Sequence, residues 1–231
     1  MNSLLEDLHN GEMKVVGRLI DASNATLLAE ISAIKSTIKV IYKPIAGERP
    51  LWDFPDGNLA HREYCAYLMS EIGQFDLVPA TILREGPFGF GMVQQWIEIN
   101  TDVDVVEYGQ GDDPQLRKMA IFDAIINNTD RKYGHLLIDQ QNHLYGCDHG
   151  VSFHEVNKLR TVLWQFMQEN FTLIEQQFIQ RCLATDLQSV FCKYLSAAEI
   201  SALMQRLESL KVENRFPSPS DQWPAVPWPP V

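Results

Sequence analysis

The spacing of apolar residues changes part-way along this chain of 231 residues, and that change limits the possible folds. Over the first hundred residues the apolar positions fall in short β-branched runs, a pattern typical of strands. From Pro114 onwards they recur at three- and four-residue spacing over longer stretches, which is typical of amphipathic helices. The sequence therefore predicts an α+β fold with two lobes, a β-rich first lobe and a mainly helical second lobe.

The expected elements follow from these patterns. Strands are expected at 14–20, 37–42, 80–83 and 92–97, with one helix at 59–72 that Gly73 would end. Helices are expected at 114–128, 156–168, 171–184 and 196–211, and a small hairpin would pair 135–138 with 143–146. The chain would then divide into an N-lobe (1–97), a C-lobe (98–212) and a tail (213–231).

The tail carries six of the chain's twelve prolines, so it cannot form regular structure. It also contains Phe216, Trp223 and Trp228. Because exposed aromatic area favours association, we expect the tail to lie extended against the folded body with these aromatic side chains buried. Proline restricts the free chain, so this ordering costs little entropy.

Charge and composition exclude several classes of function. Nineteen basic and thirty acidic residues give a net charge of −11, which argues against nucleic-acid binding and against docking on an anionic membrane. No apolar run approaches the roughly 18 residues that span a bilayer, and the N-terminal segment lacks a signal-peptide pattern. The four cysteines include no CxxC pair. We therefore expect a cytoplasmic protein with reduced thiols.

Two charged residues stand out in the predicted N-lobe. Lys43 ends the strand TIKVIY, and Glu63 lies midway along the helix. Taken singly, each is an ordinary solvated residue. A strand lysine and a helix glutamate that follows it in the chain can also form an ion pair that directs the ammonium at nucleotide phosphates.

The segment 127–135 (NNTDRKYGH) lies between a hydrophobic helix and a short strand, so it is a loop fixed at both ends. Catalytic groups are often found on such loops. In a phosphoryl-transfer loop, Asp130 would orient the acceptor hydroxyl and take its proton, Lys132 would neutralise the moving charge, and His135 would hold a metal. The alternative is a polar turn between helix and hairpin.

A second acidic motif, Gly146-Cys147-Asp148-His149-Gly150, follows the predicted hairpin. One hairpin separates Asp148 from Asp130, and its return would bring the two carboxylates to one site. The small polar loop 21–26, which contains Ser23 and Asn24, can offer hydroxyls and backbone N–H groups to phosphate oxygens, although the ordinary interpretation of such a loop is a simple turn. The glycine-rich stretch 86–91 is predicted to be a turn, since no helix follows it.

The order of these motifs resembles the kinase superfamily. The Asp130-Arg131 pair resembles the loop of phosphatidylinositol 3- and 4-kinase-like enzymes. The segments KPIAGERPLWDFPDG, HREYCAYL, GMVQQWIE, NNTDRKYGHLL and KLRTVLW, which together extend over most of the chain, resemble an uncharacterised bacterial family of that type.

The resemblance implies a two-lobed kinase-like fold and an ATP-dependent phosphotransferase with a divalent metal, Mg²⁺ or Mn²⁺. Lys43 would contact the phosphates and Glu63 would hold it. Asp130 would be the catalytic carboxylate and Lys132 the transition-state cation. The remaining implied contacts are adenine with Gln94, Gln95, Trp96 and Ile97, phosphates with Ser23 and Asn24, and metal with His135 and Asp148.

Two departures from the kinase pattern leave alternatives open. Position 135 is His where kinases generally have Asn, and position 149 is His where the usual triplet has Phe. Imidazole favours Mn²⁺ over Mg²⁺. Because the two histidines depart from the kinase pattern, a nucleotide-binding pseudokinase is the second hypothesis. The third is a metal-dependent hydrolase with ligands among Asp130, His135, His143, Asp148, His149 and His154. For a kinase, we expect the acceptor to be a small-molecule or protein hydroxyl rather than a lipid.

Overall fold

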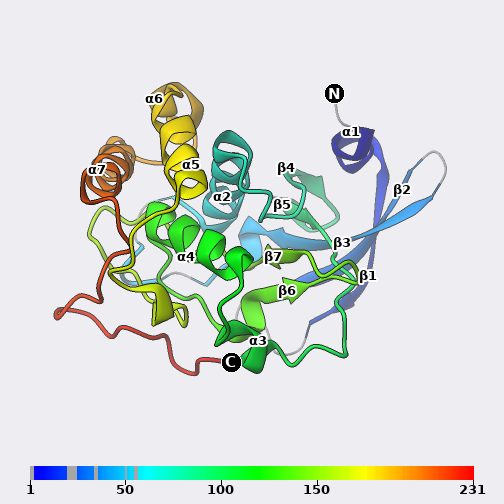
Figure 1. Ribbon diagram of the computed structural model, residues 1–231. Helices are drawn as coiled ribbons and strands as arrows, with labels where there is room; N and C mark the ends of the chain where they lie inside the picture. The colour runs from blue at the N-terminus through cyan, green and yellow to red at the C-terminus, as the bar shows by residue number, and fades with distance from the viewer. Residues whose placement is uncertain (1–2, 20–24, 34–35, 50, 55–56) are drawn as a thin grey trace.

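The computed structural model describes residues 3–19, 25–33, 36–49, 51–54 and 57–231. Within them the first part of the chain forms an antiparallel sheet with strand order β1-β2-β3-β5-β4 (Figure 1). Its strands are β1 (Glu12–Arg18), β2 (Leu27–Ser32), β3 (Thr37–Pro44), β4 (Thr81–Gly86) and β5 (Gly89–Gln95). Ser23 and Asn24 lie outside the described residues.

Alternation along β3 determines which side chains enter the sheet's core. Val40 and Tyr42 are fully buried and pack with Leu8 of helix α1 (Ser3–Asn10). Because successive side chains of a strand point to opposite faces, Lys43 lies on the other face, toward helix α2 (Leu59–Gly73). The sheet is therefore covered by α1 on one face and presents Lys43 on the other.

Helix α2 begins at a well-defined cap. The side chain of Asn58 accepts a hydrogen bond from the backbone N–H of His61 at 2.8 Å. Glu48 accepts from the N–H groups of Leu59 and Ala60, each at 2.8 Å. These acceptors satisfy N–H groups that the first turn of a helix leaves free. The capped turn fixes the start of the helix that carries Glu63.

The second part of the chain is mainly helical, as predicted. Its elements are α3 (Val105–Gly109), α4 (Pro114–Ile126), the hairpin β6 (Leu136–Ile138) and β7 (Leu144–Gly146), α5 (Leu173–Leu183), α6 (Leu187–Phe191) and α7 (Ala197–Glu213). Short 3₁₀ turns occupy Ile45–Gly47, Tyr133–His135 and Trp164–Phe166.

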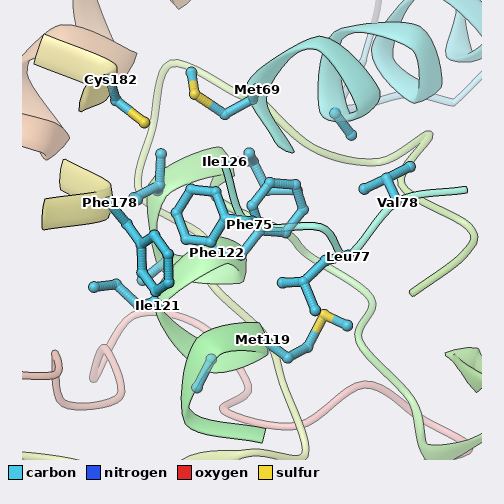
Figure 2. Close-up of a cluster of buried hydrophobic side chains, with 14 of the residues drawn as sticks. Met69, Phe75, Leu77, Val78, Met119, Ile121, Phe122, Ile126, Phe178 and Cys182 are labelled. Atoms are coloured by element: carbon cyan, nitrogen blue, oxygen red, sulfur yellow. The ribbon is translucent and has the colours of Figure 1, made fainter. Parts of the chain in front are cut away.

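Helix α4 runs through the larger hydrophobic core. Figure 2 shows Phe122 of α4 beside Phe75, which follows α2, and Phe178 of α5. The ring centroids of Phe75 and Phe178 are 4.6 Å apart, and those of Phe75 and Phe122 are 5.1 Å apart. This packing gives the 127–135 loop, which leaves the end of α4, a rigid support.

The structure corrects several predicted elements. Segment 156–168 is not a helix, since its backbone bonds to the 127–135 loop: Arg160 N–H donates to Asn128 O at 3.0 Å and Val162 N–H to Arg131 O at 3.2 Å. Strand β2 and helices α1, α3 and α6 were not predicted, and β5 ends at Gln95 rather than Ile97. The turn predicted at 86–91 is confined to residues 87–88, and the rest of that stretch belongs to β4 and β5.

The tail lies against the helical part of the molecule, but the prediction for its aromatic residues is only partly right (Figure 1). Phe216 is buried at 3% exposure, Trp223 is half-buried, and Trp228 is 89% exposed. Trp228 was therefore wrongly predicted to be buried. Among the described residues, no helix is long and apolar enough to cross a membrane.

Candidate active site

Lys43 lies between two carboxylates from distant parts of the chain. Its Nζ is 2.7 Å from Oε1 of Glu63 on α2 and forms a second ion pair with Asp148, just after β7. Burial acts to lower the pKa of Lys43, but the charges of Asp148 and Glu63 outweigh it and raise the pKa. The predicted Lys43–Glu63 ion pair is thus present, and the lysine stays charged.

Glu63 joins the helix, the sheet and the segment after β7. Its Oε2 accepts the backbone N–H of His149 at 2.9 Å while its Oε1 binds Lys43. The side chain of Glu63 is only 2% exposed. These contacts compensate for its burial, because a buried charge is stable only when it is paired. Glu63 therefore fixes the position of Lys43 and of the backbone next to Asp148.

Asp130 is held at the turn that follows α4. Asn127 ends the helix in the left-handed conformation, and the side-chain oxygen of Asn128 accepts the N–H of Asp130 at 3.0 Å. The carboxylate of Asp130 lies 3.4 Å from Nζ of Lys132. Burial raises the pKa of Asp130 even though Lys132 acts to lower it, which makes the carboxylate a better proton acceptor.

A buried ion pair fixes the 127–135 loop to helix α4. The guanidinium of Arg131 binds both carboxylate oxygens of Asp123 on α4, each at 2.9 Å, and neither side chain is exposed. Arg131 also lies 2.7 Å from Nε2 of His149. Burial, followed by the charge of Arg131, lowers the pKa of His149, so this imidazole stays neutral and accepts the hydrogen bond.

His135 and Asp148 could together hold a divalent cation. Nε2 of His135 is 3.6 Å from Oδ2 of Asp148. Burial lowers the pKa of His135 to about 4, so its imidazole is neutral near pH 7, and the ammonium of Lys43 holds the pKa of Asp148 below its usual value. A neutral imidazole and an ionised carboxylate are both able to bind a metal, and phosphate oxygens could supply further ligands.

The segment predicted to hold adenine is already engaged within the sheet. The side chain of Gln94 donates to Thr81 Oγ1 at 2.9 Å and is buried. The N–H of Gln95 donates to Ala80 O at 2.8 Å and that of Trp96 to Lys39 O at 3.0 Å. The side-chain amide of Gln94 and the N–H groups of Gln95 and Trp96 are therefore already used within the sheet and are not available to adenine.

The six-residue cluster expected for a hydrolase does not form. His143 Nε2 lies 2.8 Å from Asp76 O, and His154 packs edge-on against Phe54. In the described part of the chain, no group of three or more His, Cys, Asp and Glu side chains is placed to hold a metal. The hairpin holds His135 and Asp148 together but directs His143 elsewhere.

A cavity of about 480 Å³ lies outside this site. It is bounded by α4, α7, segment 155–164 and the first part of the tail, and includes Asn127, Trp164 and Arg206 among its lining residues. None of the residues that surround Lys43 lines it.

Asp123 and Asn128 were not predicted to support the site, and no structural role was predicted for Arg131. One signal was available. Asp123 is a charged residue within the apolar stretch MAIFDAII, where it would be costly unless paired, and Arg131 follows eight residues later, beyond the end of α4. The side chain of Asn128 links the buried ion pair to the candidate catalytic residue, because it donates to Asp123 at 2.9 Å and accepts from the N–H of Asp130.

No protein-family model matches the sequence. The chain is 39% identical over 263 aligned residues to Protein Rv2133c of Mycobacterium tuberculosis, and the alignment covers 96% of this chain and 93% of that protein. This chain belongs to the family of Protein Rv2133c. The high coverage of both sequences means that the whole architecture described above is shared rather than one segment of it.

A solved structure relates this fold to the kinases. The crystal structure of the Golgi casein kinase superposes with a TM-score of 0.56 and 13% identity, covering 92% of this chain and 73% of that one. At this identity the likeness concerns the fold alone. The α+β, kinase-like fold is confirmed, whereas membership of a phosphatidylinositol 3-/4-kinase family is not shown.

Proposed function

We propose that this chain is an ATP-dependent phosphotransferase that acts on a non-lipid hydroxyl, carried by a small molecule or a protein. The observation that carries the proposal is the position of Lys43, held between Glu63 on α2 and Asp148 after β7. In this proposal residues 1–97 form the nucleotide side and residues 98–212 supply the catalytic loop. The strongly acidic chain supports a non-lipid acceptor, because membrane surfaces are anionic.

Each group at the site has a specific task in phosphoryl transfer. The ammonium of Lys43 would bind phosphate oxygens while Glu63 keeps it oriented. Asp130 would accept a hydrogen bond from the acceptor hydroxyl and take its proton as the phosphoryl group moves. Lys132, beside Asp130, would stabilise the negative charge that develops on the transferred group.

Asp148 and His135 are the residues that would hold the divalent metal. When bound, Mg²⁺ or Mn²⁺ would neutralise phosphate charge. Arg131 fixes the backbone at both ligands. Its NH1 donates to the carbonyl of His135 at 3.3 Å and to that of Cys147, the residue before Asp148, at 3.2 Å. The two ligands would therefore be held in place before the nucleotide binds.

We further propose that the loop is of the phosphatidylinositol 3-/4-kinase-like type, because an Asp-Arg pair opens it. In this chain the arginine of that pair, Arg131, turns inward to Asp123 and leaves Asp130 beside Lys132. The proposal concerns the architecture of the loop and leaves the acceptor to be determined.

The test is transfer or hydrolysis of the γ-phosphate of ATP by the purified chain, with Mg²⁺ and with Mn²⁺. Asp130→Asn keeps the size and hydrogen bonding of the side chain but removes the proton acceptor. We expect turnover by the original chain and a large loss in Asp130→Asn, with ATP binding retained in both. Equal turnover by the two proteins would contradict the proposal.

A nucleotide-binding module without turnover is the second candidate. The observation that favours it is the pair of histidines at 135 and 149, the second of which is hydrogen-bonded to Arg131. ATP binding measured by calorimetry, together with no γ-phosphate release under either metal, would support this second function.

A further inference from the structure

The tail returns from the last helix to the site proposed for catalysis. It leaves α7 at Asn214 and runs along the helical part of the molecule toward α3 and the 127–135 loop (Figure 1). Among the described residues, its backbone is fixed at Phe216, at Ala225 and at Pro230. The first anchor binds the core, the second binds the segment that pairs with the loop, and the third binds the loop itself.

The first anchor holds the tail to the core. Phe216 packs against Phe171 with ring centroids 4.9 Å apart and lies under the guanidinium of Arg117 at 4.8 Å. Its N–H donates to Glu169 O at 3.0 Å, and its carbonyl accepts the N–H of Gln168 at 3.1 Å. This anchor is independent of the loop, so it would hold the tail even if the later contacts were removed.

The second anchor binds the segment around Thr161, which pairs with the loop. The carbonyl of Ala225 accepts the backbone N–H of Thr161 at 3.1 Å and the indole N–H of Trp164 at 2.8 Å. Thr161 in turn pairs as a parallel bridge with Arg131, the residue after Asp130. Two donors from different residues on one carbonyl fix the position of the tail relative to this bridge.

The third anchor is on the loop itself. The carbonyl of Pro230 accepts the N–H of Tyr133 at 2.9 Å, and Tyr133 directly follows Lys132. The backbone around Asp130 and Lys132 is therefore tied to the tail on both sides, through Thr161 and through Tyr133. The tail thus supplies an acceptor for one backbone N–H of the loop and for one of the segment paired with it.

We propose that residues 225–230 are a positioning segment that holds Asp130 and Lys132 in their productive arrangement. This inference rests on the proposed phosphotransferase function. The segment acts on the reacting groups through Tyr133 and Thr161. Three of its six residues are prolines, which restrict the free segment, so little entropy is lost when it docks. Displacement of a catalytic group by about 1 Å can cost on the order of 10²-fold in rate.

The experiment compares two shortened chains with a matched control. One chain ends after Pro224 and loses the anchors at Ala225 and Pro230, and the other ends after Pro229 and loses only the anchor at Pro230. Gln222→Ala is the control, because Gln222 is an exposed residue of the tail that lies before the positioning segment, and the substitution leaves both backbone acceptors in place. If the shorter chain fails to fold, the chain that ends after Pro229 still tests the contact with Tyr133.

Two measurements are made on each protein. Backbone hydrogen exchange should accelerate roughly tenfold or more where an anchor is lost. In the chain that ends after Pro224 we expect this over both 130–136 and 160–165. In the chain that ends after Pro229 we expect it over 130–136 alone. The kcat for ATP turnover should fall about tenfold to a hundredfold while the Kd for ATP stays within about twofold. Gln222→Ala should match the unmodified chain in every measurement.

The outcomes separate this inference from the proposed function. Unchanged exchange at Tyr133 and Thr161, or unchanged kcat after truncation, overturns the positioning role. An increase in kcat also overturns it, because the segment would then be an inhibitory cover. If the original chain shows no turnover, the proposed function fails, while loss of protection in the truncated chains would still show that the segment orders the loop.

Discussion

The acidic residues around the loop after α4 fall into two groups of opposite character. Asp123 is fully buried against Arg131, which binds both of its carboxylate oxygens. Asp130 and Asp148 have side chains 36% and 51% exposed, with oxygens that solvent or a ligand can reach. A buried, fully paired carboxylate contributes to structure, whereas a carboxylate that is at least partly exposed beside a lysine remains available for chemistry.

The strongest test of this comparison is Asp130→Asn. Removal of the proton acceptor should lower turnover on the order of 10²–10⁴-fold, with the unfolding midpoint in urea almost unchanged. Steady-state kinetics and urea unfolding measure the two effects on one preparation. Asp102→Asn is the control, since Asp102 is exposed and remote in sequence from the loop. A large loss of stability in Asp130→Asn would place Asp130 with the structural group instead.

Arg131→Met tests the buried side of the comparison. It leaves the Asp123 carboxylate unpaired in the core, which should cost about 3–5 kcal/mol of unfolding free energy. Chemical denaturation followed by tryptophan fluorescence measures this change. The control is Lys211→Met, which removes an exposed pair with Glu208. A surface substitution of this kind should change the unfolding free energy by no more than about 0.5 kcal/mol. Equal stability of the two variants would show that the pair beneath the loop is dispensable.

This contrast also shows what the sequence could reveal. Strand and helix spacing predicted β3, α2, α4 and the hairpin. The Lys43–Glu63 pair was one interpretation of a strand lysine followed by a helix glutamate, and the resemblance to kinases implied it. Segment 156–168 has helix-like apolar spacing, yet its backbone bonds to the loop, a long-range contact that local spacing cannot encode. The return of the tail to Tyr133 was hidden for the same reason. The pairing of Asp123 with Arg131, only eight residues later, was different, because a charged residue within an apolar stretch already signals a buried partner.

Lys43→Ala should have a smaller effect, on nucleotide affinity. Loss of a hydrogen bond between charged groups corresponds to about 1.5–3 kcal/mol of ATP binding, roughly 10- to 150-fold in Kd. Calorimetric titration with ATP measures it. Lys39→Ala is the matched control, because Lys39 lies earlier on β3 and pairs with the exposed Glu98. Equal ATP affinity in the two variants would remove Lys43 from the nucleotide site.

The smallest expected effect concerns metal preference at His135. An imidazole accepts Mn²⁺ more readily than Mg²⁺, whereas an amide oxygen suits the harder ion. His135→Asn should therefore lower the ratio of Mn²⁺- to Mg²⁺-supported turnover by a few-fold, and shift the metal dependence of ATP binding in the same direction. The matched control is His143→Asn, on the same hairpin but bound to Asp76 O. If His135 serves only to order the hairpin beside Asp148, the substitution will change thermal stability and leave both metal ratios as they are.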